Sequence, residues 1–236
     1  MKKFELTSEF ITFLGKKLFR IKALVSFGDV KDGELGGFVE KEENLDQSGD
    51  AWVSGDARVY GNAQVSGNAQ VSGDARVYGN AQVYGDAWVS GDARVYGDAR
   101  VYGNAQVSGN ARVYGNAQVS GNAQVSGDAW VSGDARVYGN AQVSGNAQVS
   151  GDARVYGDAQ VQCCRDYSAT SCFGSQNRTT TFFREKDGEI GVRCGCFHGT
   201  LDEFIEKVKE RHGDSRLAKE YLMLADLMEF RLSNDE

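Results

Sequence analysis

The chain has 236 residues and a formal net charge of −7. An acidic chain lacks the net basic surface that a general nucleic-acid binder needs, and no run of about 18 apolar residues marks a membrane span. Proline is absent, which suits a fold that uses most of its backbone N–H groups as donors.

The N-terminus and the cysteines indicate the cellular compartment of the protein. Glu5, Ser8 and Glu9 interrupt the first stretch of the chain, so the apolar region of a signal peptide is missing. All five cysteines lie between Cys163 and Cys196, and an odd number of thiols in a reducing compartment favours free cysteines. We therefore expect a cytoplasmic protein.

Residues 1–48 predict a small β-rich N-terminal cap. The β-branched and aromatic stretches 10–14 and 18–25 flank a short connection that contains glycine, which is typical of a β-hairpin. Val39 and Leu45 stand six residues apart, the period of the repeat that follows. We expect them to form an atypical rung that leads into this repeat.

Nineteen consecutive six-residue units run without interruption from Gly49 to Gln162. Gly stands first in each unit, Asp or Asn second, Ala third and Val fifth, and the fourth position holds only Gln, Arg or Trp. Ala and Val alternate with polar residues as in a β-strand, and Gly followed by Asp or Asn favours a turn. A short strand and a short turn repeated in this way close best as a three-sided coil of eighteen residues. The array 49–162 therefore predicts a solenoid of about six coils.

The unit Val-Ser-Gly-Asn-Ala-Gln resembles the hexapeptide repeat, in which a small residue follows an aliphatic one by four positions. Proteins with this repeat form left-handed parallel β-helices. The resemblance implies a left-handed parallel β-helix for the array. Together with the β-rich cap and a small α+β C-terminal domain, which the residues themselves predict, it gives a mainly β fold. Hexapeptide β-helices also commonly associate through their flat sides, so the resemblance implies a trimer.

A period of eighteen sorts the outward positions of the array onto three faces. The Gln/Ser face carries Trp52, Gln70, Trp88, Gln106, Gln124, Gln142 and Gln160, each followed by Ser two positions later except in the last unit. The Arg/Tyr face carries Arg58, Tyr60, Arg76, Tyr78, Arg94, Tyr96, Arg112 and Tyr114, then Trp130 and Gln148. The mixed face carries Gln64, Gln82, Arg100, Gln118, Arg136 and Arg154.

The Arg/Tyr face has two interpretations. Asp precedes most of the Arg by two positions, so the face can be a charge-compensated, solubilising stripe copied by duplication of the repeat. Alternatively, Arg and Tyr are favoured in binding hot spots, and the face is a candidate surface for a protein or nucleotide partner. The array has 7 Arg and 10 Asp, a net charge of −3, which argues against a nucleic-acid partner. Arg planes are expected to stack on Tyr rings, and the three Trp to be surface aromatics.

Residues 163–236 predict a small ββαα domain that packs on the last coil. Strands are expected at 179–184 and 189–194, around a turn that contains glycine. Thr200 and Glu203 form a capping-box pattern that opens a first helix, and Gly213 is placed to end it. A second helix is expected from about 215 to 232. The predicted inward residues are Phe204, Ile205 and Val208, then Leu217, Tyr221, Leu224, Ala225 and Met228.

The C-terminal domain offers two candidate sites. The first combines zinc-ligand types, although their spacing differs from the usual knuckle and structural thiols are the alternative: Cys163, Cys164, Cys172, Cys194, Cys196 and His198. The second is a polar loop with Ser175, Asn177 and Arg178, which could bind an anion through backbone N–H groups and the guanidinium. An ordinary turn is the alternative for this loop.

Hexapeptide β-helices are best known as acyltransferases that use a His from a coil or an inserted loop as general base. The array has neither a His nor an inserted loop, because His198 and His212 both lie in the C-terminal domain. His212 is expected to make a favourable contact at a helix C-terminus. We therefore predict no catalytic residue and no cofactor.

Two further segments carry a family resemblance. Residues 27–39 and 44–53 are similar to the lead-in of YdcK-like hexapeptide proteins. The tail Cys194–Phe204 is similar to phage and prophage proteins of unassigned function. These resemblances imply a bacterial or phage-infected host cell and leave the activity open.

Together these features favour a non-enzymatic β-helical scaffold that presents repeated surface ladders to a protein partner or to copies of itself. The alternative is a phage-type accessory protein whose C-terminal domain binds a small anionic ligand or a host defence protein. Acyl transfer is a third interpretation. No membrane partner is expected.

Overall fold

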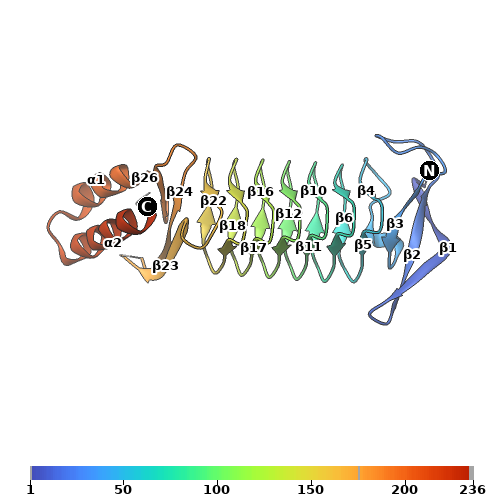
Figure 1. The fold of residues 1–236 in the computed structure, drawn as a ribbon, viewed down its shortest axis with the longest axis horizontal. Helices are drawn as coiled ribbons and strands as arrows, with labels where there is room; N and C mark the ends of the chain where they lie inside the picture. The colour runs from blue at the N-terminus through green and yellow to red at the C-terminus, as the bar shows by residue number, and fades with distance from the viewer. Residues whose placement is uncertain (1, 175, 234–236) are drawn as a thin grey trace.

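The computed structural model describes residues 2–174 and 176–233 of the chain. The molecule is a rod in which the array lies between an N-terminal β-hairpin and a C-terminal unit with two helices (Figure 1). Each six-residue unit contributes one short strand, and strands eighteen residues apart pair in parallel and in register, as Gln106 does with Gln124. The predicted parallel, three-sided β-solenoid is confirmed. Its left-handed winding stays a prediction.

The strands divide among the three faces as the period of eighteen predicts. The Gln/Ser face contains β4 (Trp52–Val53), β7 (Gln70–Val71), β10 (Trp88–Val89), β13 (Gln106–Val107), β16 (Gln124–Val125), β19 (Gln142–Val143) and β22 (Gln160–Val161). The Arg/Tyr face contains β5 (Arg58–Val59), β8 (Arg76–Val77), β11 (Arg94–Val95), β14 (Arg112–Val113), β17 (Trp130–Val131) and β20 (Gln148–Val149). The mixed face contains β6 (Gln64–Val65), β9 (Gln82–Val83), β12 (Arg100–Val101), β15 (Gln118–Val119), β18 (Arg136–Val137) and β21 (Arg154–Val155).

The core of the rod consists of the Ala and Val of every unit, none of which is more than 1% exposed. Backbone groups bond from coil to coil, as Gln106 N does when it donates to Ala123 O of the next coil at 2.9 Å. Each coil therefore needs a partner on both sides, since an unpaired row of backbone groups is costly when buried and aggregation-prone when exposed.

The expectation that all three Trp lie on the surface is wrong for Trp52. Its side chain is only 2% exposed, and Phe27 packs edge-on against it with ring centroids 5.4 Å apart. Trp88, at the equivalent position two coils later, is 52% exposed. The difference arises because the N-terminal segment folds back over the first coil.

The N-terminal segment extends the Arg/Tyr face by three strands. The predicted hairpin is confirmed as β1 (Phe4–Phe13) and β2 (Lys16–Ala23), followed by β3 (Leu35–Val39) and the short 3-10 helix η1 (Glu42–Asn44). Val39 pairs in parallel with Val59, and Leu45 forms a parallel bridge with Val65. The predicted atypical rung is thus confirmed.

The turn of the hairpin is strained. Leu14 has a φ of 50° and is followed by Gly15 with a φ of 77°, as in a two-residue hairpin turn that favours Asn-Gly. Leu14 is also 77% exposed, so its side chain adds little packing. We expect Leu14→Asn to raise the free energy of unfolding by about 0.5–1 kcal/mol, measured by chemical denaturation. Leu14→Val should lower it, because a β-branched residue tolerates this backbone region less well; the opposite order would contradict this account.

The C-terminal unit is an antiparallel sheet covered by two helices. The sheet has the order β23 (Tyr167–Phe173), β24 (Arg178–Arg184), β25 (Ile190–Cys194) and β26 (Phe197–Thr200), followed by α1 (Leu201–His212) and α2 (Arg216–Leu232). The predicted strand pair and both helices are confirmed, but the prediction of only two strands is wrong. β23 is rich in Ser, Thr and Cys, and β26 has four residues that run directly into the helix cap.

The helix caps form as the sequence predicts. Thr200 Oγ1 accepts a hydrogen bond from Glu203 N at 3.3 Å, and the Glu203 carboxylate accepts one from Thr200 N at 3.0 Å. Gly213 ends α1, and Ser215 caps α2. Phe204 and Tyr221 are buried in the core beneath the two helices.

Candidate functional site

The tyrosines of the Arg/Tyr face stack on one another. Tyr60, Tyr78, Tyr96 and Tyr114 form a column in which neighbouring ring centroids are 4.8–5.0 Å apart and ring planes differ by at most 4°. This spacing follows from the strand separation in a parallel sheet. Burial raises the pKa of Tyr60, Tyr78 and Tyr96 above its ordinary value. These three phenols are therefore protonated at neutral pH, and the column presents an aromatic stripe.

The N-terminal hairpin covers the first two rungs of this face. Phe13 packs edge-on against Tyr60 with centroids 5.8 Å apart, and the guanidinium groups of Arg58 and Arg76 lie 4.7 and 5.1 Å from the Phe13 ring centroid. Tyr60 is only 7% exposed. The predicted surface is thus divided, and its uncovered part consists of Arg94, Tyr96, Arg112 and Tyr114.

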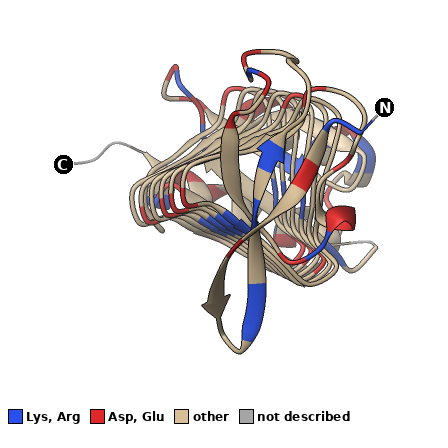
Figure 2. Ribbon diagram, turned by 90° about the vertical axis from the view of Figure 1, so that its right-hand side faces the viewer, with Lys and Arg blue, Asp and Glu red and all other residues tan. Residues whose placement is uncertain are grey.

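The arginines are not neutralised in the predicted way. In the part of the chain that the structure describes, no Arg of the array forms an ion pair with the Asp two positions before it. Three of them contact aromatic rings instead: Arg58 and Arg76 lie over Phe13, and the Arg112 guanidinium lies 5.0 Å from the Trp130 ring. Viewed along the coils, the Lys and Arg of successive coils superpose as stripes, with Asp and Glu mainly at the turns (Figure 2).

The Asp and Asn of the array have a role that the sequence interpretation missed. Asn side chains at the corners donate to the residue at the same corner of the next coil, and this residue is often Asp. These bonds have Nδ2–Oδ1 distances of 2.9–3.0 Å in the pairs Asn68–Asp86, Asn80–Asp98, Asn110–Asp128, Asn116–Asp134 and Asn140–Asp158. In the sequence, the signal for these bonds is an Asn that precedes an Asp by eighteen residues.

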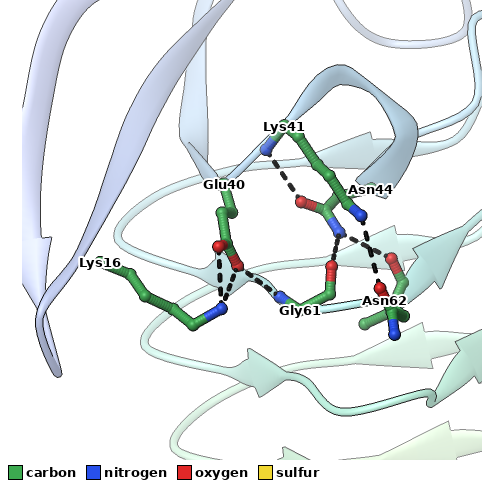
Figure 3. Close-up of polar contacts among 7 residues, drawn as sticks. Lys16, Glu40, Lys41, Asn44, Gly61 and Asn62 are labelled. Atoms are coloured by element: carbon green, nitrogen blue, oxygen red, sulfur yellow. Dashed lines mark hydrogen bonds and ion pairs between the residues drawn. The ribbon is translucent and has the colours of Figure 1, made fainter.

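The N-terminal end of the solenoid is closed by polar side chains. Lys3 Nζ donates to the carbonyl oxygens of Ser48, Gly49 and Ala51 at 2.9–3.3 Å, and burial lowers the pKa of this ammonium. Asn44 Nδ2 donates to Gly61 O at 3.1 Å (Figure 3) and to Ala63 O at 2.9 Å. These carbonyl groups at the start of the solenoid therefore have partners within the same chain.

A salt bridge anchors the hairpin to this end. Both carboxylate oxygens of Glu40 accept from Lys16 Nζ at 2.8 Å, and one also accepts from Gly61 N at 2.6 Å (Figure 3). Partial burial acts to raise the pKa of Glu40, but the hydrogen bonds from Lys16 and Gly61 N together outweigh it and lower the pKa.

The C-terminal end is closed by the four-stranded sheet. Phe183 of β24 is fully buried and belongs to the same core as the Ala and Val of the array. Arg154 N donates to Thr181 Oγ1 at 3.0 Å, and Lys186 N donates to Asp158 O at 3.2 Å. Both ends of the solenoid are thus covered by aperiodic segments of the chain.

Tyr156 joins the last coil to this sheet. Its ring lies edge-on to Phe183 at 5.2 Å, and its hydroxyl donates to Val192 O at 3.3 Å. Burial, followed by the charge of Glu185, raises the pKa of Tyr156 to about 12. The phenolate is therefore disfavoured in the folded protein.

This shift predicts an alkaline weakening of the junction. The pKa of Tyr156 is higher in the folded chain than in the unfolded chain, where it is about 10. Its stabilising effect is therefore fully present below about pH 10 and is lost as the pH rises through about 12. We expect Tyr156→Phe to flatten this part of the pH dependence in urea denaturation. Tyr138→Phe removes only a lesser contribution to the raised pKa of Tyr156 and should change the pH dependence much less; equal curves for both variants would contradict the assignment.

The predicted C-terminal sites are dispersed. Among the described residues, no group of three or more His, Cys, Asp and Glu side chains is arranged to hold a metal ion, so the six predicted zinc-ligand candidates do not form one site. Cys194 is half-buried and Cys196 is exposed, so the alternative of buried structural thiols does not fit Cys196. In the predicted anion loop, Ser175 lies outside the described residues, and Asn177 and Arg178 are exposed.

The fold and its ends define a class of protein: a three-sided parallel β-solenoid with an uninterrupted array and closed ends. A family model for bactofilins, described as polymer-forming cytoskeletal, matches residues 51–165. The array is thus similar to bactofilins over almost its whole length. None of the curated proteins matches the chain. None of the described helices combines the length and apolar character that crossing a membrane requires.

Proposed function

We propose that this chain is a non-enzymatic, rod-shaped scaffold that associates with further copies of itself. The observation that carries the proposal is the uninterrupted array, whose residues match a polymer-forming family. Repeated, nearly identical surfaces allow a second copy to dock with many weak contacts acting together.

The closed ends indicate that copies associate side by side. Coil-on-coil stacking would require the Lys3 and Asn44 contacts at one end, and the Phe183 packing at the other, to be displaced. The three flat faces need no such rearrangement.

Of the three faces, the Gln/Ser face is the best suited to bind a second copy of the chain. Its outward fourth positions carry no charge, and Trp88 near its middle is 52% exposed. Interface cores are depleted of charged residues and enriched in aromatic ones. On the Arg/Tyr face, by contrast, two rungs are already covered by the hairpin, and a second copy docked through the same face would bring arginines together.

The proposal is tested by placing Arg on the Gln/Ser face. The repeat already accepts Arg at this position of the unit, as at Arg112, so Gln106→Arg combined with Gln124→Arg should fold normally. We expect this variant to lose self-association in sedimentation velocity and in electron micrographs. The matched control, Gln82→Arg with Gln118→Arg, places the same charges on the mixed face and should associate like the unmodified chain.

Two results would contradict the proposal. A chain that stays monomeric at all accessible concentrations would exclude self-association. If both double variants associate normally, the Gln/Ser face is not the interface.

A further inference from the structure

A cavity of about 280 Å³ lies in the C-terminal unit. This unit is at the opposite end of the rod from the hairpin (Figure 1). Its walls come from the β23–β26 sheet and from both helices. Phe197, Phe204 and Tyr221 line it, and neighbouring ring centroids in this group are 5.5–5.7 Å apart. A cavity with such walls favours a flat apolar molecule.

The polar lining of the cavity is cationic. Arg178, Lys207 and Arg211 line it, and no carboxylate among the described residues does, although the whole chain has a net charge of −7. Lys207 pairs with Glu210 at 2.6 Å. Arg178 and Arg211 form no ion pair with any described residue.

These two guanidinium groups come from different elements. Arg178 begins β24 and Arg211 lies in the last turn of α1, so only the tertiary fold brings them to one cavity. Guanidinium groups bind carboxylate, sulfonate and phosphate oxygens through paired, charge-assisted hydrogen bonds.

We propose that this cavity binds a small amphipathic organic anion. The flat apolar part of the ligand lies among Phe197, Phe204 and Tyr221, and its anionic group pairs with Arg178 and Arg211. This function is separate from self-association, because the cavity shares no residue with the three faces of the array.

The experiment uses two dyes with the same rings. The probe is 8-anilinonaphthalene-1-sulfonate, and its uncharged counterpart is N-phenyl-1-naphthylamine. We expect the full chain to bind the sulfonate with a rise in fluorescence. Arg178→Gln combined with Arg211→Gln should weaken sulfonate binding at least about tenfold, since each charge-assisted bond contributes strongly, and should change binding of the uncharged dye less than about twofold.

A second variant controls for the exposed apolar stripe of α2. Met223, Leu227 and Phe230 are 56–80% exposed and could bind the dye non-specifically. Replacing all three with Gln should leave the affinity for the sulfonate unchanged. Dye binding that depends on this stripe and not on the arginines would overturn the proposal.

Cysteine alkylation locates the bound dye independently. Cys196 lines the cavity and is exposed, whereas Cys164 is exposed and does not line it. We expect the sulfonate to slow alkylation of Cys196 several-fold and to leave Cys164 unaffected, as followed by mass spectrometry. Unchanged alkylation of Cys196 at saturating dye would refute the site, whatever the state of self-association.

Discussion

Replacing Gly133 with Ala is expected to lower the free energy of unfolding by about 2–4 kcal/mol. Gly133 has a φ of +67°, and an added Cβ would lie 2.9 Å from Gly151 N of the next coil. The substitution therefore combines an unfavourable backbone conformation with a collision against a backbone atom that cannot rotate away. Chemical denaturation followed by circular dichroism measures the loss.

The matched control is Gly151→Ala, one coil further on. Gly151 has almost the same φ, +66°, but no heavy atom lies within 4 Å of its added Cβ. This variant should lower the free energy of unfolding only through the unfavourable backbone conformation, by roughly 1–2 kcal/mol. If the two variants were equally destabilised, close coil-to-coil contact would not be the reason for glycine at the first position.

Replacing Phe183 with Ala is expected to destabilise the C-terminal end by about 3–5 kcal/mol. The ring is fully buried, and it packs against both the last coil and Tyr156. Its removal leaves a cavity at the place where the regular core of the solenoid ends.

The loss should be local, because each coil of a solenoid contacts only its neighbours. Hydrogen exchange should accelerate at Val155 and Val161 while Val107, in the middle of the array, keeps its protection. Phe230→Ala is the control, because Phe230 is 80% exposed and its removal should change stability by no more than about 0.5 kcal/mol. Acceleration throughout the array would show that the rod unfolds as one cooperative unit.

The sequence predicts the array well because one local rule is applied nineteen times. Ala and Val must point inward in every unit, so a period of eighteen assigns each outward residue to a face without knowledge of distant contacts. The two helices of the C-terminal unit are equally predictable from the sequence, because Thr200, Gly213 and Ser215 mark their ends by local hydrogen bonding. The strands β23 and β26 were missed because neither has a strong alternation of apolar residues.

The candidate site could be predicted only in part. The column of four tyrosines follows from the period, but its coverage by Phe13 depends on the direction in which the hairpin folds. The same segment buries Trp52 and leaves Trp88 exposed, although both occupy the same position of the repeat. Identical local sequence therefore produces different surfaces at different distances from the end of the rod.

Periodicity thus determines the solenoid, its core and its three faces, because these depend on interactions repeated every six and eighteen residues. The closed ends and the cationic cavity depend on single contacts between segments far apart in the chain. Lys3 Nζ donates to Ala51 O, and Arg178 and Arg211 line one cavity. Such pairings leave no periodic trace, since each occurs once and its geometry is set by how the aperiodic segments pack on the array and on each other.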